Sequence, residues 1–292
     1  MENVDYREEM RKLVLEIRDR KLENQVIVTQ NATNLFFEEG KIIETFFNGV
    51  DGIAQESLIY GVGGKNMKTP KEEKKELLDN LIPLRERGKP VFSVNYGEGD
   101  KRKKEVKKNM KKYNFIGELV PDPEANIIFL PIEKSEMEDV SHLSEVKNFL
   151  YLLNPEKFKN LEEYFKALDR TDVDLLIIEP HLKGKILDKS QIEKLKTRKN
   201  GTKRLVIGYL SLGEGEDYRK YWKKTWKKEK PHWIMEKNPH WAGSYRVKYW
   251  DPEWKEIVKQ YQESLKEIGL DGYYLDTLDT YYYFEKRSIT NE

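Results

Sequence analysis

Two carboxylates that each end a short apolar run are the side chains best suited to chemistry in this sequence. Asp276 closes the run 273–276, and Glu56 closes the run 52–56. In barrels and open α/β sheets, parallel strands present functional side chains at their carboxyl ends. A pair of carboxylates suits glycoside hydrolysis, in which one protonates the leaving oxygen and the other attacks the anomeric carbon or activates water.

Each of the two carboxylates also has a structural interpretation. Asp276 could cap a helix or occupy a turn, and Glu56 could belong to a salt bridge. We favour a functional role for Asp276 because the pattern Leu-Asp-x-x-Asp, which ends at Asp279, places two acids at a strand end. We favour one for Glu56 because an unpaired carboxylate directly after an apolar strand is costly.

Other polar side chains follow the predicted strands. Gln30 and Asn95 carry amides, which do not titrate at useful pH, so we expect them to position other groups by hydrogen bonds. Glu179 stands at a strand end, where supporting the site and contacting the substrate are equally open interpretations. Glu214 and Arg219 share a polar loop in which a stabilising ion pair is the default interpretation.

Eight apolar runs recur along the chain and alternate with amphipathic stretches. Near-continuous apolar strands are typical of parallel sheets that are buried on both faces. The alternation predicts a single α/β domain over residues 1–292, a (β/α)8 TIM barrel. The expected strands are 26–30, 52–56, 91–95, 127–130, 149–153, 175–179, 205–210 and 273–276, and the expected helices are 7–20, 71–87, 101–112, 161–168, 189–196 and 253–268.

The composition limits the expected partners. The 53 Lys and Arg balance 52 Asp and Glu, and a net charge of +1 argues against nucleic acid or a membrane surface as a partner. Because there is no cysteine and the four histidines are scattered, we expect no disulfide, metal site or cofactor. The start of the chain has no signal-peptide pattern, and the sequence does not indicate the cellular compartment of the protein. We expect a monomer, and the Lys/Glu-rich composition is typical of a thermophile protein.

All six tryptophans lie between residues 222 and 254. Tryptophan rings bury large areas and also stack on sugar faces. We expect most of them to be packing residues and one or two to meet a ligand, and the sequence gives no basis for choosing among them.

Three stretches in the second half of the chain resemble a known family. Residues 205–222, 247–254 and 271–279 are similar to signatures of glycoside hydrolase family 114, the endo-α-1,4-polygalactosaminidase-like TIM barrels. Archaeal and bacterial members of that family were once mislabelled cysteinyl-tRNA synthetases, but this chain has neither a HIGH nor a KMSKS signature. The resemblance implies a TIM barrel that hydrolyses an α-linked polysaccharide, with a galactosaminan-like amino-sugar polymer as one candidate.

The first third of the chain resembles the later half of the same family. Residues 28–31, 52–60 and 92–96 are similar to motifs that in the family follow the motif around Asp276, whereas here they precede it. The resemblance therefore implies a circular permutation, in which residues 1–133 correspond to the family's C-terminal half and residues 144–292 to its N-terminal half. The segment 134–143 would join the family's original ends, and both a natural and an engineered origin stay open.

The resemblance also implies roles for individual residues. Asp276 and Glu56 match the two catalytic carboxylates, with Asp276 expected as nucleophile and Glu56 as acid/base in a retaining mechanism. Glu179 and Asn95 stand where the family usually has aspartates, which predicts an altered substrate preference. A carbohydrate-binding barrel without turnover, or a permuted variant made to study folding, are the alternatives. The expected substrate-binding residues are Glu179, Tyr209, Glu214, Arg219, Asp279, Gln30, Asn31, Asn95, Tyr60 and Tyr96.

Overall fold

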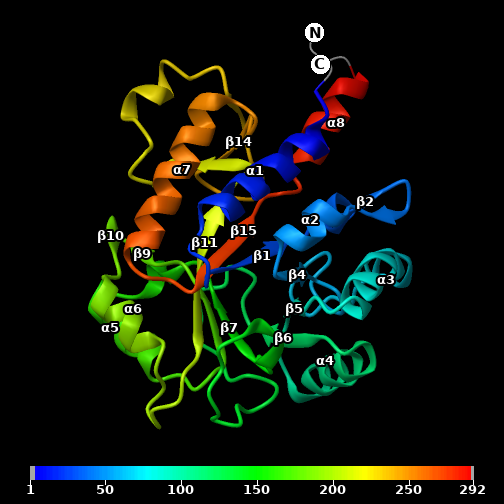
Figure 1. Ribbon diagram of the computed structural model, residues 1–292, viewed down its shortest axis with the longest axis vertical. Helices are drawn as coiled ribbons and strands as arrows, with labels where there is room; N and C mark the ends of the chain where they lie inside the picture. Colours follow the sequence, from blue (N-terminus) through cyan, green and yellow to red (C-terminus); the bar gives the residue numbers. More distant parts are fainter. Residues whose placement is uncertain (1–3, 291–292) are drawn as a thin grey trace.

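Eight parallel strands form a nearly closed barrel at the centre of the computed structural model, which describes residues 4–290 (Figure 1). The strands are β1 (Val26–Gln30), β4 (Gly52–Glu56), β5 (Val91–Tyr96), β6 (Ile116–Val120), β7 (Phe149–Leu152), β8 (Leu175–Ile178), β11 (Leu205–Ser211) and β15 (Gly272–Asp276). Their order around the barrel is β6-β5-β4-β1-β15-β11-β8-β7. The predicted α/β TIM barrel is confirmed.

Helices cover the outside of the barrel. In α1, Met10, Val14 and Ile17 recur at a spacing of three and four residues and are fully buried, so one face of the helix packs on the barrel. The start of α7 is fixed by the Asp251 side chain, which accepts a hydrogen bond from the Glu253 amide. The helices are α1 (Tyr6–Arg20), α2 (Glu44–Gly49), α3 (Lys71–Glu86), α4 (Asp100–Tyr113), α5 (Leu161–Asp169), α6 (Lys189–Leu195), α7 (Pro252–Glu267) and α8 (Thr280–Thr290).

The strands are apolar on both faces because each face packs on a different part of the core. Val28, Ala54 and Ile207 belong to the cluster inside the barrel, whereas their neighbours Ile27 and Ile53 belong to the cluster beneath the helices. This alternation follows from the two-residue period of a strand. It also means that alternate residues near the carboxyl ends point to the barrel centre.

One of the eight predicted strands is wrong. Residues 127–130 form no strand, and Leu130 is 81% exposed. The eighth strand is instead β6, which pairs in register with β5 although it contains Gly117 and the acidic Glu118. The apolar residues at 127–130 therefore did not make a strand, whereas the less apolar segment after α4 did, because it pairs with β5.

The barrel closes between β6 and β7, where a buried carboxylate bridges the gap. Glu118 of β6 accepts hydrogen bonds from the backbone amides of Ile132, at 2.7 Å, and Phe149, at 3.5 Å. Burial raises the pKa of Glu118 well above its usual range, and the two amides oppose this shift. The connection to β7 carries no α-helix, and its predicted irregular part, 134–143, is mostly exposed.

Small sheets lie in the loops that follow three of the barrel strands. Such loops occupy the carboxyl-terminal face, where barrels hold their functional sites. A three-stranded sheet follows β11, and its order is β12-β14-β13. The short strands are β2 (Phe37–Glu38), β3 (Lys41–Ile42), β9 (His181–Leu182), β10 (Lys185–Ile186), β12 (Glu214–Glu216), β13 (Ile234–Lys237) and β14 (Ser244–Val247).

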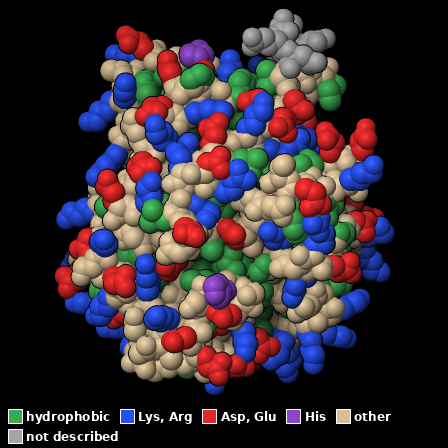
Figure 2. All heavy atoms as spheres, viewed as in Figure 1, with side chains coloured by type: hydrophobic (Ala, Val, Ile, Leu, Met, Phe, Trp, Pro, Cys, Tyr) green, Lys and Arg blue, Asp and Glu red, His purple; other side chains and the backbone are tan. Residues whose placement is uncertain are grey.

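Helices α1 and α8 pack against each other on one side of the barrel (Figure 1). Arg7 of α1 donates two hydrogen bonds to Glu285 of α8, at 2.7 and 3.1 Å, so the first and last described helices lie side by side. The face drawn in Figure 2 carries acidic and basic side chains interspersed, as the balanced composition implies. Within residues 4–290, none of the helices has the length and apolar content to cross a membrane.

A buried ion pair at the amino-terminal face gives a stability prediction. Arg198 and Asp174 are 2.7 Å apart, with side-chain exposures of 0% and 4%. Because Arg198→Met leaves the Asp174 carboxylate buried without its partner, we expect it to lower the free energy of unfolding by about 3–5 kcal/mol in urea titration. The matched variant Lys166→Met breaks the exposed pair with Glu162 and should change it by at most about 0.5 kcal/mol. Equal effects would contradict this interpretation.

Candidate active site

The amide of Gln30 joins the two carboxylates singled out in the sequence. Its Nε2 donates to Glu56 Oε2 at 2.9 Å and to Asp276 Oδ1 at 3.0 Å. The two oxygens are therefore no farther apart than the sum of these distances, about 5.9 Å. This contact follows from the strand order, because β1 lies between β4 and β15 and all three strands end together.

Two tyrosines inside the barrel fix the orientation of the Gln30 amide. The hydroxyl of Tyr151 donates to Gln30 Oε1 at 2.7 Å, and that of Tyr274 donates to the same oxygen. Because the oxygen receives both hydroxyls, the amide nitrogen must face the carboxylates. Both tyrosines are almost completely buried, at 2% and 0% exposure, so packing holds this support in place.

Each carboxylate has further donors of its own. Glu56 accepts a hydrogen bond from Asn31 Nδ2 at 2.8 Å and another from the Tyr96 hydroxyl. Asp276 accepts one from the Tyr209 hydroxyl at 2.9 Å and one from the backbone amide that follows it, at 2.7 Å. The positions of both carboxylates are thus defined by hydrogen bonds from at least three groups each.

The three strands of this site end in the same unusual backbone conformation. Asn31, Ser57 and Thr277 follow β1, β4 and β15 directly, and their φ angles are 56°, 57° and 62°. Positive φ is uncommon for residues other than glycine and is a clear outlier for a β-branched residue such as Thr277. Such strain costs on the order of 1–3 kcal/mol per residue and tends to persist at functional sites.

Close packing around Thr277 supports its strained conformation. Its hydroxyl accepts hydrogen bonds from the amides of Leu212, at 3.1 Å, and Gly213, at 2.8 Å. A side chain at Gly213 would place its Cβ 2.2 Å from the Thr277 carbonyl oxygen, so this approach requires glycine. The loop after β11 therefore helps to hold the end of β15 and with it Asp276.

Carboxylates gather around the pair and alter its protonation. Burial raises the pKa of Asp276 well above its usual range, and the charge of Glu56 raises it further. Burial also raises the pKa of Glu56, with Asp279 adding to the effect and hydrogen bonds from Tyr96 and Asn31 opposing it. Each carboxylate therefore opposes the ionisation of the other, because two close carboxylates resist joint ionisation.

Asp279 and Glu214 lie at the edge of the same group. Asp279 is exposed at the mouth, yet protein surrounds it on most sides and this burial raises its pKa. Burial likewise raises the pKa of Glu214, against hydrogen bonds from Ser244 and Asn238, and the charge of Asp279 adds to the rise. The structure thus brings four acids into one region of the mouth.

Glu179 and Arg219 form a separate buried ion pair, and the ion pair expected within the polar loop is that of Arg219 with Glu216. Arg219 Nη2 lies 2.6 Å from Glu179 Oε2, and its Nε lies 2.6 Å from Glu216. Burial favours a higher pKa for Glu179, but Arg219 and His181 outweigh it and lower the pKa to about 2. Glu179 is therefore an ionised anchor, unlike Glu56 and Asp276.

Two predicted site residues point elsewhere. The Asn95 side chain accepts hydrogen bonds from the amides of Ile59 and Tyr60 and donates to the Glu118 carbonyl, so it supports the loop after β4. The Tyr60 hydroxyl bonds Glu105 on α4, away from the carboxylate pair. Neither side chain joins the group around Gln30.

Sequence reasoning also missed residues that the site needs. Tyr151 and Tyr274 were counted only as strand residues. The available signal was a tyrosine inside an otherwise apolar strand, because a buried hydroxyl requires a partner. No sequence signal pointed to His181 and Tyr261, which contact each other and the Glu179–Arg219 pair.

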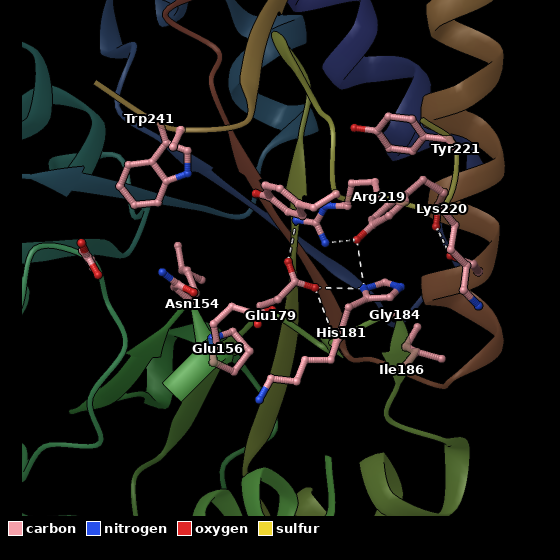
Figure 3. A pocket seen from close by; sticks show the side chains of 18 of the residues that line it. Asn154, Glu156, Glu179, His181, Gly184, Ile186, Arg219, Lys220, Tyr221 and Trp241 are labelled. Atoms are coloured by element: carbon pink, nitrogen blue, oxygen red, sulfur yellow. Dashed lines mark hydrogen bonds and ion pairs between the residues drawn. The ribbon is translucent and has the colours of Figure 1, made fainter. Parts of the chain in front are cut away.

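A cleft of about 1200 Å³ opens beside the pair, over the ends of β7 and β8 (Figure 3). Glu179 and Arg219 lie at its centre, between Trp241 on one side and Lys220 and Tyr221 on the other. No group of three or more His, Asp or Glu side chains in residues 4–290 is arranged to hold a metal ion.

The fold and site define a TIM barrel with paired carboxylates on its carboxyl-terminal face. Glycoside-hydrolase family GH114 is the family whose sequence model matches this chain, over residues 147–292, which is half of its length. The chain belongs to family GH114.

Two relatives match parts of this chain. An uncharacterized protein of Methanocaldococcus jannaschii is 32% identical over 199 residues, which cover 63% of this chain and 57% of that protein. An uncharacterized protein of Thermotoga maritima is 42% identical over 83 residues, 28% of this chain and 26% of that protein. The alignments therefore span less than two thirds of each relative.

A crystal structure also shows a partial likeness. Aspergillus fumigatus Ega3, solved in complex with galactosamine, is 25% identical where it matches, over 38% of this chain and 39% of that chain. The TM-score of this match is 0.30.

The raised pKa values give a prediction on stability. Because the folded protein holds protons on Glu56 and Asp276 more tightly than the unfolded chain, the free energy of unfolding falls as pH rises above about 4. Asp276→Asn replaces one of the two carboxylates with a neutral amide and so removes their mutual opposition to ionisation. It should therefore be more stable than the wild type by about 0.5–2 kcal/mol at pH 7. The difference should shrink toward pH 4 in urea titrations.

The control is Glu162→Gln. Glu162 is exposed, and a hydrogen bond from Lys166 lowers its pKa, so this variant should gain no stability at pH 7. An Asp276→Asn protein that is less stable than the wild type at pH 7 would show that the site carries no such electrostatic penalty.

Proposed function

We propose that this protein is a glycoside hydrolase that uses Glu56 and Asp276 as its carboxylate pair. The observation that supports this most directly is the Gln30 amide, which holds the two carboxylates within about 5.9 Å of each other. Their separation on the barrel face suits one acid on each side of a glycosidic bond. Membership of GH114 supports the same reaction class.

We propose a retaining reaction. Retaining glycosidases hold their carboxyl groups about 5–5.5 Å apart and inverting ones about 6.5–9.5 Å apart, and the limit set by Gln30 favours the former. In the first step Glu56 gives its proton to the leaving oxygen while Asp276 attacks the anomeric carbon. In the second step Glu56 takes a proton from water, whose oxygen attacks that carbon and releases Asp276.

The nucleophilic role requires Asp276 to be ionised when substrate is bound. In the free protein the pKa of Asp276 is raised well above its usual range, by burial first and by Glu56 second. A cationic amino sugar beside Asp276 would favour its ionised form and leave Glu56 as the protonated acid. The assignment of nucleophile to Asp276 and acid/base to Glu56 therefore goes together with an amino-sugar substrate.

The acids at the mouth favour that substrate class. Glu56, Asp276, Asp279 and Glu214 gather at one region, where the charge of Asp279 raises the pKa of the other three. Such a group attracts a cationic, de-acetylated sugar polymer. Family resemblance points to an α-linked galactosaminan-like polysaccharide.

Binding without turnover is the second candidate, because Asn95 stands where the family usually has an acid. Its amide, however, bonds the backbone of Ile59, Tyr60 and Glu118 and does not face the pair. The change to Asn95 thus removes no proton-transfer group beside Glu56 or Asp276. This placement favours hydrolysis over binding alone.

We also propose that the two halves of the chain stand in exchanged order relative to the family, with the boundary in 134–143. Support comes from the side-by-side packing of α8 and α1, which would follow each other between β15 and β1 in the family order. A chain that links α8 to α1 and opens within 134–143 should give the wild-type circular dichroism spectrum. Loss of the folded signal would contradict the exchange.

Removing either carboxylate should abolish hydrolysis. We expect Glu56→Gln and Asp276→Asn each to lower kcat on α-1,4-linked galactosamine oligosaccharides by at least about 10²-fold, the usual contribution of such a group. Release of reducing ends measures the rate. The control variant Glu105→Gln affects an acid that bonds Tyr60 and Lys68 away from the pair, and it should keep wild-type activity.

The outcomes separate the two candidates. Binding of these oligosaccharides without release of reducing ends by the wild type would favour the binding protein. Full activity in both carboxylate variants would exclude the pair from the reaction.

A further inference from the structure

The large cleft lies beside the carboxylate pair rather than over it. Arg219 lines the cleft, and its guanidinium lies 5.9 Å from the ring of Tyr209, whose hydroxyl bonds Asp276. One aromatic side chain thus separates the cleft from the pair. The cleft walls come from the loops after β6, β7, β8 and β11 and from α7, so the cleft opens on the catalytic face.

Two exposed aromatic rings stand on the wall of this cleft. Trp241 is 41% exposed, more than the other five tryptophans, and Tyr218 is 57% exposed. Their segments are held together, because the Asp217 amide donates to the Gly243 carbonyl at 2.8 Å. A side chain at Gly243 would meet Tyr218 within 3.3 Å, so the two segments pack closely.

The turn that carries Trp241 is anchored to the acids of the mouth. Asn238 and Ser244 flank this turn, and both donate hydrogen bonds to the carboxylate of Glu214. The Trp241 amide donates to the Asn238 carbonyl at 3.4 Å, and its carbonyl accepts from the Ser244 amide at 3.3 Å. The indole is therefore exposed but placed on a fixed support next to the site.

Charges in the cleft balance, unlike those around the pair. Glu179 at its centre is paired with Arg219. The remaining charged lining consists of two acids and two bases, namely Glu124, Glu156, Lys183 and Lys220. A balanced surface with exposed aromatic rings suits an uncharged ligand with both apolar and hydroxyl-bearing faces.

We propose that this cleft binds uncharged, N-acetylated sugar residues of the same glycan chain, with Trp241 and Tyr218 stacked on pyranose faces. This inference rests on the proposed hydrolase function. The cleft volume of about 1200 Å³ exceeds the range of about 300–1000 Å³ typical of small-molecule sites, so it accommodates several sugar rings. The preferred substrate is then a partly de-acetylated polymer, with a cationic residue at the pair and acetylated residues in the cleft.

The test uses oligosaccharides of α-1,4-linked galactosamine of increasing length, in de-acetylated and partly N-acetylated forms. Trp241→Ala should raise KM for long, partly acetylated chains about tenfold and leave the shortest cleaved substrate unchanged. Trp241→Phe keeps a ring and should restore most of the affinity. Tyr282→Ala, which removes an exposed ring outside the cleft, should behave as the wild type.

The inactive variant Glu56→Gln allows binding to be measured without turnover. Its calorimetric affinity for long, partly acetylated chains should exceed that for de-acetylated chains of equal length, and adding Trp241→Ala should remove the difference. Cleavage that is unaffected by Trp241→Ala at every chain length would overturn the cleft assignment alone. If the wild type neither binds nor cleaves any of these chains, the cleft proposal and the proposed function fail together.

Discussion

The side-chain amide of Gln30 is the interaction on which the rest of the site depends. A single nitrogen donates to both Glu56 and Asp276, and the oxygen on the other side of the amide receives two buried tyrosine hydroxyls. Reversing the amide would turn an acceptor toward two carboxylates and leave hydroxyls facing a donor. The barrel interior therefore sets the spacing of the two acids, and at this spacing each opposes the ionisation of the other.

The fold brings Gln30 within reach of both carboxylates, because β1 lies between β4 and β15 and all three strands end together. The residues after these strands, Asn31, Ser57 and Thr277, all take positive φ, so the chain leaves the barrel abruptly just past each functional side chain. Strain of this kind is sustained only where surrounding contacts define the conformation. At Thr277 these contacts come from the loop after β11, which approaches so closely that only glycine fits at position 213.

Much of this arrangement was predictable from the sequence, because parallel strands leave a strong apolar signal and place their last residues at one face. The apolar signal identified seven of the eight strands. The shared face of the strand ends accounts for the side chains that lie close to the two acids, namely Gln30, Asn31, Tyr96 and Tyr209. The strand β6 was not predicted, because Gly117 and Glu118 interrupt its apolar run. Position at a strand end could not reveal side-chain direction, so the sequence did not show that Asn95 and Tyr60 form their hydrogen bonds away from the pair.

The cleft could not be predicted at all, because loops from four parts of the chain build it. Six tryptophans looked alike in the sequence, and only tertiary packing left Trp241 exposed. The balanced charge around Glu179 and Arg219 likewise depends on residues far apart in the chain. Strand ends are local features, whereas the surface between loops is a property of the whole fold.

The stereochemistry of the first product tests the central claim most directly, since it depends on the spacing that Gln30 imposes on Glu56 and Asp276. Proton NMR can follow the anomeric signal as the protein cleaves an α-1,4-linked galactosamine oligosaccharide. The account predicts that the α-anomer forms first and then equilibrates with the β-anomer. Initial formation of the β-anomer would contradict it, because a single displacement by water needs a wider separation of the two carboxylates.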